Sequence, residues 1–507
     1  MNGPRDLRAW IAELRKAGEL VEVTQEVDPY LEITEIADRA MKGGGPALLF
    51  SNVKGSQIPL LINQFGTERR MLMALGADSL DAIGDAIGEL LELKPPDGLV
   101  DKVRALGRLK SVADARPKLV KSAPCQEVVW PEPDLDRLPI QFCWPDDGGP
   151  FMTLANIITK DPVTGGRNVG MYRLQKHSKR ELGLHWQMHK DAAADWTEGA
   201  GRMEVAIALG TDPITTYSGS MPLPKHIDEY MVAGWLRDDP IELVQCTTID
   251  LQVPANAEII IEGYCERGEL RPEGPFGDHT GYYTPVDDFP VLHVTAITSR
   301  RDPIYPSIVV GPPPCEDLWL AKATERIFLP AVRVTLPEVV DYDLPYAGTF
   351  HNCAIFSIRK RFPGHALKVM HAIWGTGLLS LTKAVIIVDE WVDPHDYNQV
   401  VWQMGANIDP AEDILISRGP LDQLDHAARI KALGGKIGFD ATAKWEGEGY
   451  TRDWPEVNRI PADVKAQVDE RWASLGIPLP GFDGTFRRAS EAAPAGSKGM
   501  LDRLRGR

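Results

Sequence analysis

Apolar residues recur along the chain at two different spacings, and the first segment shows the helical one. Leu7, Trp10, Ile11 and Leu14 are three or four residues apart, which predicts a helix with Gly18 as its C-terminal cap. A strand is expected at 47–53 and helices around 79–94. We therefore expect an N-terminal α/β domain over residues 1–120.

Short apolar strands dominate the next region, which we expect to form a domain over residues 121–315. The segments 153–160 and 168–175 flank the sequence DPVTGG, an arrangement typical of a β-hairpin. The same region holds one amphipathic helix and further candidate strands: the helix 225–237 and the strands 204–210, 241–247, 257–264, 291–299 and 305–311. Many short strands separated by Gly- and Pro-containing turns predict a barrel or a sandwich.

Strands and helices alternate after residue 330, which predicts a C-terminal α/β domain over residues 330–490. The expected strands are 353–360, 383–390 and 413–418, and the expected helices are 364–375 and 396–406. The glycine-rich stretch LGGKIGFDATAKW (433–445) is neither a GxGxxG fingerprint nor a Walker loop, and reads as a lid or a connection. Residues 491–507 read as a flexible tail or a short terminal helix. The predicted fold class is a multidomain α+β protein.

Composition and charge narrow the classes of function. The 507 residues carry a formal net charge of −17, which argues against binding to nucleic acid or to an anionic membrane surface. An anionic substrate would therefore have to be attracted by a local cluster of positive groups. Six cysteines without a CxxC pair are typical of buried thiols in a reducing compartment. No apolar run is long enough for a membrane span, and charges stand where a signal peptide would be apolar, so a cytoplasmic protein is predicted.

Candidate chemistry first appears in the basic segment 165–191, which contains Asn168, Arg173, His185 and His189. On a strand, Arg173 would face away from Asn168 unless a bulge intervenes. The two histidines are four residues apart and would share one face of a helix, where such a pair can bind a metal. A solvated basic hairpin explains the same residues.

An acidic residue, Glu242, lies inside the apolar strand 241–247 and could face either solvent or the interior. If it points inward it needs a cation, because buried carboxylates are rarely left unpaired. Together with Asn168 and His185 it would offer an oxygen–nitrogen–oxygen ligand set. That set suits a hard or borderline ion such as Mn²⁺ or Mg²⁺.

Two further acids, Glu273 and Asp278, lie in the irregular segment RPEGPFGDHTGYYTP (271–285). Its glycines and prolines predict turns rather than a long helix or strand. Acid pairs perform general acid–base catalysis when their surroundings push their pKa values apart. Taken alone, the segment is compatible with either a catalytic site or a solvated loop tip.

Four motifs in order, NVGMYR, HWQMHKD, PEGPFGDHTGYY and GFDATAKW, resemble the UbiD family of reversible decarboxylases. The likeness extends over roughly residues 5 to 455, and the last fifty or so residues fall outside it. The family's fold implies a central split β-barrel that binds prenylated FMN, a flavin with an additional ring. This agrees with the strand-rich middle of the chain.

The resemblance also implies roles for individual residues. Mn²⁺ (or Mg²⁺) would be held by Asn168, His185 and Glu242, with His189 as the alternative histidine, and K⁺ would lie near residues 217–222. Arg173, Glu273 and Asp278 match the family's catalytic trio, in which Asp278 would donate a proton with a pKa raised by partial burial. The residues that would contact the flavin or its phosphate are Asn168, Met171, Tyr172, Arg173, His185, Trp186, Gln187 and Lys383.

The implied activity is a carboxy-lyase reaction: non-oxidative, reversible decarboxylation of an aromatic, heteroaromatic or α,β-unsaturated acid, with CO₂ as the second product. A flavin prenyltransferase would supply the cofactor, and the family suggests a homodimer or a hexamer. Three alternatives stay open: a physiological carboxylase, an FMN-dependent split-barrel oxidoreductase, and a non-catalytic flavin-binding subunit.

Overall fold

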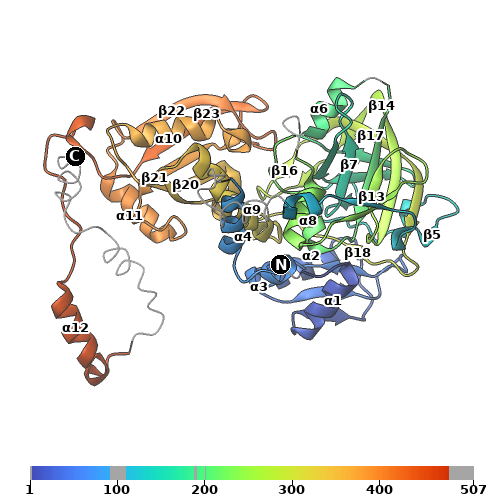
Figure 1. The fold of residues 1–507 in the computed structure, drawn as a ribbon, viewed down its shortest axis with the longest axis horizontal. Helices are drawn as coiled ribbons and strands as arrows, with labels where there is room; N and C mark the ends of the chain where they lie inside the picture. Colours follow the sequence, from blue (N-terminus) through green and yellow to red (C-terminus); the bar gives the residue numbers. More distant parts are fainter. Residues whose placement is uncertain (1–2, 92–109, 188–190, 200, 226, 479–507) are drawn as a thin grey trace. The chain divides into compact units, whose positions relative to one another are not determined.

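The computed structural model describes residues 3–91, 110–187, 191–199, 201–225 and 227–478, which fall into two compact units (Figure 1). The first unit comprises Met1–Pro330 with Gln423–His426, and the second comprises Ala331–Asp422 with Ala427–Arg507. Within the described ranges, no helix combines the length and the apolar character needed to cross a membrane.

The N-terminal part of the first unit is a small sheet with four helices. Asp6 caps the first helix by accepting a hydrogen bond from the backbone nitrogen of Ala9 (2.7 Å). The four apolar residues that predicted this helix are all buried, which confirms it. The sheet order is β1-β2-β3-β18, and the bounds are β1 Leu20–Val23, β2 Ala47–Phe50, β3 Leu60–Ile62, β18 Tyr305–Pro306, α1 Leu7–Lys16, α2 Glu32–Lys42, α3 Glu68–Leu75 and α4 Leu80–Leu91.

A nine-stranded sheet forms the centre of the first unit. Its main path is β6-β9-β10-β17-β14-β11-β7-β8, and β5 pairs with β17. The predicted hairpin is confirmed, because β7 and β8 pair in antiparallel fashion with Lys160 opposite Arg167. The bounds are β5 Val128–Val129, β6 Phe151–Met152, β7 Asn156–Lys160, β8 Arg167–Met171, β9 Leu174–Ser178, β10 Glu181–Leu184, β11 Met203–Leu209, β14 Ile259–Glu273 and β17 Asp287–Ser299.

The two ends of this sheet are joined by a very short connection. Strand β8 stands at one end of the path and β9 is next to the other end, yet only Tyr172 and Arg173 separate them in sequence. Three residue steps span at most about 11 Å, so the sheet must curl until its ends approach each other. The result is a curled, half-barrel sheet with Arg173 at its seam, which decides between the barrel and the sandwich that the strand pattern allowed.

The longest strands, β14 and β17, carry much of the curvature. Their register shifts after Glu262 and again between Cys265 and Leu270, and such irregularities bend a strand and increase its twist. At the first shift, a Cβ on Gly263 would lie 2.4 Å from the backbone oxygen of His293, so the strands approach there as only glycine allows.

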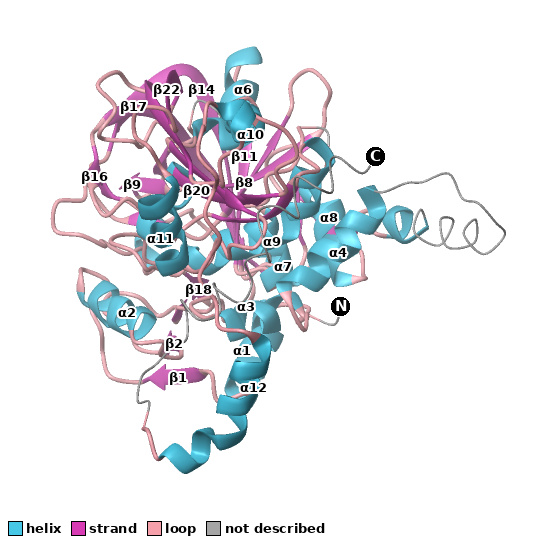
Figure 2. Cartoon of the chain, turned by 90° about the vertical axis from the view of Figure 1, so that its left-hand side faces the viewer, coloured by secondary structure: helices cyan, strands magenta, loops and turns pink. Residues whose placement is uncertain are grey.

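Smaller elements complete the first unit. Asp212 and Asp228 cap α7 and α8, which contact each other, and α8 also lies against β8 (Figure 2). The predicted helix at 225–237 is thus found from Glu229 onward, whereas the strand expected at 305–311 is limited to β18. The bounds are β4 Lys118–Val120, β12 Glu242–Gln245, β13 Gln252–Pro254, β15 Phe276–Gly277, β16 Tyr283–Thr284, α6 Asp191–Glu198, α7 Pro213–Ser218, α8 Glu229–Arg237 and α9 Asp317–Thr335.

The second unit is built on a five-stranded sheet with the order β19-β20-β21-β23-β22. Reading the stretch 433–445 as a lid or a connection was wrong, because its first eight residues form β23, paired on both sides. One of its glycines allows close packing: a Cβ on Gly438 would lie 2.5 Å from Met370 Sδ of α10. The tail 491–507 lies outside the described residues. The bounds are β19 Val339–Asp343, β20 Cys353–Ile358, β21 Ala384–Asp389, β22 Ile414–Pro420, β23 Leu433–Asp440, α10 His365–Trp374, α11 Tyr397–Asn407 and α12 Ala462–Arg471.

Candidate active site

Arg173, at the seam of the curled sheet, binds two acids at once. Its Nε and Nη2 donate to the two oxygens of Glu273 (2.8 and 3.0 Å), and its Nη1 donates to Asp278 Oδ2 (2.5 Å). Nη2 also donates to Thr284 Oγ1 (3.0 Å), and the guanidinium lies 4.5 Å from the centre of the Phe276 ring. Four of the five guanidinium N–H groups are used by these bonds, which leaves one on Nη1.

The segment that carries the two acids is not a solvated loop tip. Glu273 ends β14 and is fully buried, and Asp278 follows β15 with 5% of its surface exposed. The turn between them is held by Asp147, whose Oδ1 accepts from the backbone nitrogen of Gly277 (2.8 Å). The two carboxylates are therefore fixed toward one arginine.

The charges around the acids lower both pKa values. Burial raises the pKa of Glu273, but the hydrogen bond from His185 and the charge of Arg173 outweigh it and bring the value to about 2. Burial likewise raises the pKa of Asp278, yet the hydrogen bonds and charge of His279, together with Arg173, hold it below its usual range. The expectation of a raised pKa at Asp278 is thus wrong, because it considered burial without these cationic partners.

His185 joins the same network from the end of β10. Its Nδ1 is 3.0 Å from Glu273 Oε2, and an ionised carboxylate can only accept, so Nδ1 carries the proton. Burial and the charge of Arg173 lower the pKa of His185, which favours the neutral ring. Its Nε2 is buried and has no hydrogen-bond partner in the described part of the chain, so a lone pair there is available for a ligand.

The helix expected from the spacing of His185 and His189 does not begin at His185. Residues 185–187 are irregular, and His189 lies outside the described residues. The backbone instead leaves β10 at Leu184 and brings His185 directly against Glu273.

The three predicted metal ligands lie in different surroundings. Asn168 lies on β8, where its Nδ2 donates to Thr159 Oγ1 (3.1 Å), so its carbonyl oxygen can serve a ligand. Glu242 is exposed at the start of β12, in a separate sheet β13-β12-β4, and faces solvent as a polar strand residue ordinarily does. The carboxylate next to Asn168 is instead Glu229, whose Oε2 accepts from the backbone nitrogen of Val169 (3.1 Å).

Sequence reasoning missed several residues of the site. Glu229 opens α8 and reads in sequence as a solvated acid of a first helical turn. His279 donates to Asp278 Oδ1 through both its backbone nitrogen and its Nδ1, each at 2.8 Å. His279 and Thr284 both belong to the segment 271–285, so the motif itself was the available signal.

The residues expected to line a flavin are divided among different surroundings. Met171 ends β8 and is half-buried, and its backbone nitrogen donates to Gly219 O (2.8 Å). Tyr172 is half-buried at the seam, next to Gly170. Trp186 is 4% exposed and packs against Trp196 at 5.9 Å between ring centres, whereas Gln187 is half-buried in irregular backbone.

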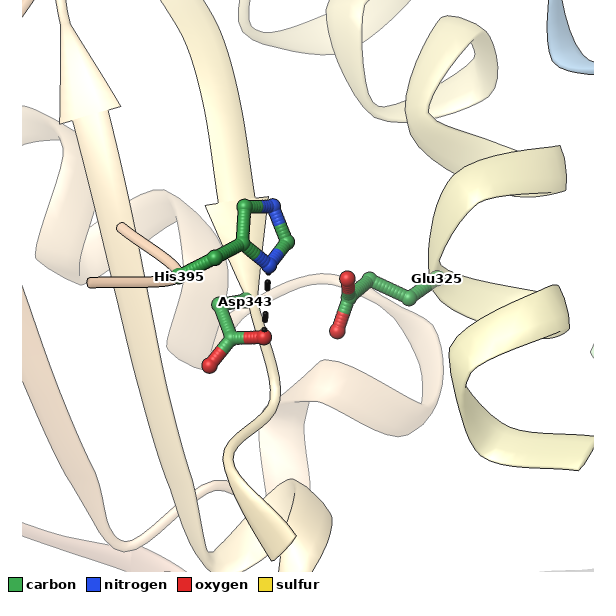
Figure 3. A group of neighbouring side chains, drawn as sticks. All are labelled: Glu325, Asp343 and His395. Carbon is green, nitrogen blue, oxygen red and sulfur yellow. Dashed lines mark hydrogen bonds and ion pairs between the residues drawn. The ribbon is translucent and has the colours of Figure 1, made fainter. Parts of the chain in front are cut away.

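Lys383 lies immediately before β21 in the second unit, and its role at the flavin phosphate stays a prediction. The same unit contains a His–Asp pair, in which His395 Nδ1 and Asp343 Oδ1 are 3.0 Å apart (Figure 3). Glu325, drawn in the same view, belongs to α9 of the first unit, where its Oε2 accepts from Lys322 Nζ (2.9 Å).

The donor atoms around β8 suit the groups that the family resemblance implies. An amide oxygen on Asn168 and a carboxylate on Glu229 are the hard ligands that Mn²⁺ or Mg²⁺ prefers. His185 adds a nitrogen donor, its buried Nε2, which has no hydrogen-bond partner among the described residues. The donor types of these residues therefore suit a divalent ion.

Known proteins and protein families match nearly the whole chain. Three domains described as 3-octaprenyl-4-hydroxybenzoate carboxy-lyase match: the N-terminal domain at residues 11–89, the Rift-related domain at 118–313 and the C-terminal domain at 318–441. An uncharacterized protein of Archaeoglobus fulgidus is 51% identical over 475 residues, which is 93% of this chain and 98% of that protein.

Solved structures with the same fold include two decarboxylase-class proteins. The closed form of the vanillic acid decarboxylase of Sedimentibacter hydroxybenzoicus has a TM-score of 0.81 at 27% identity, covering 94% of this chain and 99% of that one. An evolved dimeric form of the UbiD-class enzyme HmfF from Pelotomaculum thermopropionicum, in complex with prFMN, has a TM-score of 0.73 at 29% identity, covering 91% and 100%.

Proposed function

Because the chain belongs to the UbiD family of carboxy-lyases, we propose that it catalyses the reversible, non-oxidative decarboxylation of an aromatic, heteroaromatic or α,β-unsaturated acid with prenylated FMN. The single observation that carries this proposal is Arg173 held between Glu273 and Asp278 at the seam of the sheet. Such a buried trio has no evident task in hydride transfer, but it suits binding of a carboxylate followed by protonation of a carbon.

Each member of the trio has a distinct part in this reaction. The remaining N–H of Arg173 Nη1 would bind the substrate carboxylate, since guanidinium–carboxylate bonds are strong and directional. Glu273 fixes the plane of the guanidinium through two parallel bonds and keeps the ring of His185 in one tautomer. Asp278 would deliver a proton to the carbon that loses CO₂.

Bound prenylated FMN would supply the electron sink that no standard side chain offers. Asn168, Glu229 and His185 are our candidates for the residues that hold Mn²⁺ (or Mg²⁺) beside the cofactor phosphate, with His189 as the alternative histidine. A cation there would neutralise phosphate charge in a chain whose net charge is −17. K⁺ near residues 217–222 and a phosphate contact by Lys383 complete the proposed cofactor site.

The cellular location that we propose follows from the need for prenylated FMN. A flavin prenyltransferase must supply prenylated FMN, so the protein should act where that enzyme acts. All six cysteines are free, which is compatible with the reducing conditions of the cytoplasm. We further propose a homodimer or a hexamer of this chain.

Reconstitution tests the proposal directly. Full-length protein from a host without the prenyltransferase should be folded but inactive, and prenylated FMN, Mn²⁺ and K⁺ should restore CO₂ release from members of an acid panel without NAD(P)H. Mass spectrometry of the bound flavin provides the control for cofactor identity. Turnover with ordinary FMN and NAD(P)H would instead identify an oxidoreductase, and strong CO₂ release from protein free of prenylated flavin would refute the cofactor assignment.

A further inference from the structure

The turn that carries Asp278 packs against the chain segment that leads into α9. A Cβ on Gly281 would lie 3.3 Å from Pro312 Cα. Cβ atoms on Gly277 and Gly311 would meet the same indole, that of Trp144, at 2.1 and 2.3 Å. The two segments therefore share one packed contact, and α9 begins at Asp317, five residues after Pro312.

A row of ionisable groups leads from the catalytic arginine toward α9. Arg173 Nη1 binds Asp278 Oδ2 (2.5 Å), and Asp278 Oδ1 accepts from His279 Nδ1 (2.8 Å). Of the charged groups, His279 has the largest effect on the pKa of Asp317, which it lowers. Asp278 has the next largest effect and raises that pKa. Asp317 Oδ1 is buried, and the described residues give it no hydrogen-bond partner.

We propose that Asp317 and His279 are positioning residues that return a proton to Asp278 after each turnover, an inference that rests on the proposed decarboxylation. Asp317 would receive the proton from solvent, His279 would carry it across its ring, and Asp278 would pass it to carbon. This assigns a task to a partly buried carboxyl group that the trio itself does not need.

The proton balance of the reaction requires such a supply. Loss of CO₂ breaks a C–C bond, leaves the electron pair on the substrate, and consumes one proton when the C–H bond forms. Asp278 cannot hold that proton in reserve at neutral pH, because its pKa lies below the usual range despite the opposing effect of burial. The Nδ1–H of His279 is already in contact with the oxygen that must be recharged.

Asp317 has the acidity that a proton entry point needs. Burial raises its pKa to about 6, against the lowering effect of His279, and the charge of Asp278 raises it further. The neighbouring Glu316 is occupied elsewhere, because its two oxygens accept from the backbone nitrogens of Asn63 and Phe65 (2.8 and 2.7 Å). A group with a pKa near the working pH exchanges protons readily in both directions.

Coupling between Asp317 and His279 can be measured without turnover. In the cofactor-free full chain labelled with ¹³C at aspartate carboxyls, the resonance absent from Asp317→Asn identifies Asp317. Because His279 lowers the pKa of Asp317, His279→Gln should raise it. An Asp317 titration that is identical in the wild type and in His279→Gln would overturn the relay, whether or not the protein decarboxylates anything.

Steady-state kinetics of the holoenzyme are the second test of the relay, with Asp389→Asn as the matched control. Burial raises the pKa of Asp389 to about 6 as well, but this residue ends β21 in the second unit. Asp317→Asn should lower kcat by about 10- to 100-fold, less than loss of the acid itself, with little change in KM. It should also remove the decline of kcat as pH rises through about 6, which Asp389→Asn should retain.

The outcomes separate the relay from the proposed function. Wild-type kcat and an unchanged pH profile in Asp317→Asn would refute the relay while decarboxylation stands. If the wild type releases no CO₂ from any acid, the proposed function fails, and the carboxyl titration alone then decides whether Asp317 and His279 exchange charge as a pair.

Discussion

At the scale of single residues, Asp278 has the most testable role. Asp278→Asn preserves the shape of the side chain but removes the titratable proton, so we expect turnover to fall by about 10²–10⁴-fold while flavin stays bound. Exchange of the product hydrogen in D₂O should fall in parallel, since it reverses the same proton transfer. The matched control is Asp146→Asn, which changes an exposed aspartate nearby and should leave both rates unaltered. Wild-type exchange in Asp278→Asn would show that another group protonates the carbon.

The metal proposal distinguishes two glutamates by their surroundings. Glu229 is 8% exposed beside the backbone of Val169, whereas Glu242 is exposed on β12. We expect Glu229→Gln to lower the content of divalent metal and of flavin together, because the metal would bridge the cofactor phosphate. Elemental analysis and flavin absorbance after reconstitution measure both contents.

Glu242→Gln is the control for this experiment and should retain full metal and flavin. If Glu242→Gln loses both while Glu229→Gln keeps them, the ligand first expected from the sequence is restored and Glu229 is a structural acid.

The candidate site shows which of its residues could be predicted from the sequence and which could not. The motif match identified Arg173 together with Glu273 and Asp278, which lie 100 and 105 residues further along the chain and meet it in the structure. Glu229 escaped because a helical first turn is an ordinary place for a solvated acid. Its burial depends on α8 lying against β8, a contact between elements that no local pattern encodes.

At the scale of elements, the close packing around Trp144 predicts a sensitive position. A Cβ on Gly277 would lie 2.1 Å from Trp144 Cδ1, and the indole is fixed by its own bond from Nε1 to Val310 O (2.7 Å). Gly277→Ala should therefore cost about 1–3 kcal/mol of stability and displace the adjacent Asp278. A displacement near 1 Å can lower kcat by about 10²-fold.

Thermal unfolding and kcat measure the two effects, and Gly435→Ala is the control. No atom lies within 4 Å of a Cβ built on Gly435, so this substitution should change neither quantity appreciably. Equal behaviour of the two variants would mean that Trp144 moves aside at little cost.

A buried lysine in β23 predicts a dependence of stability on pH. Lys436 Nζ donates to Ser380 O and Thr382 O (2.6 and 2.8 Å), and burial lowers its pKa to about 8. In the unfolded chain a lysine has a pKa near 10.4, so between about pH 8 and pH 10 the unfolded chain binds the additional proton. The free energy of unfolding therefore rises with pH in this window, by at most about 1.4 kcal/mol per pH unit.

Lys436→Met removes this group, so the stability of the wild type relative to the variant should increase from pH 8 to pH 10. Urea midpoints at several pH values measure the difference, and Lys121→Met, at an exposed position, supplies the control. A constant difference across the window would show that Lys436 titrates alike in both states.

Elements with a clear pattern of apolar residues were predicted well. Elements interrupted by glycines, or fixed by contacts with distant residues, were not. The hairpin of β7 and β8 follows from two alternating strands around a turn. Strand β23 was missed because Gly434, Gly435 and Gly438 interrupt its alternation, and the use of Gly438 is visible only once Met370 packs on the sheet. The irregular path after β10 had no local signal, since it depends on the bond between His185 and Glu273.

At the scale of the whole molecule, the fold brings distant segments to one seam, while the charge of the chain opposes its proposed substrate. The sheet path leaves β8 at one end and β9 next to the other, and the curl of the sheet places Arg173 where these strands approach each other. The net charge of −17 produces a repulsive field for carboxylates around this cation. A carboxylate substrate is therefore attracted by Arg173 at short range and repelled by the net negative charge at long range.

This difference in range predicts the effect of salt. The Debye length falls from about 30 Å at 0.01 M to about 8 Å at 0.15 M, so added salt screens the distant acids much more than the buried contact with Arg173. We expect kcat/KM for a carboxylate substrate to rise over this interval of ionic strength. Binding of the corresponding neutral amide, measured as competitive inhibition, should change little and serves as the control. A fall in kcat/KM with salt would mean that positive groups near the entrance outweigh the net charge of −17 and attract the substrate from a distance.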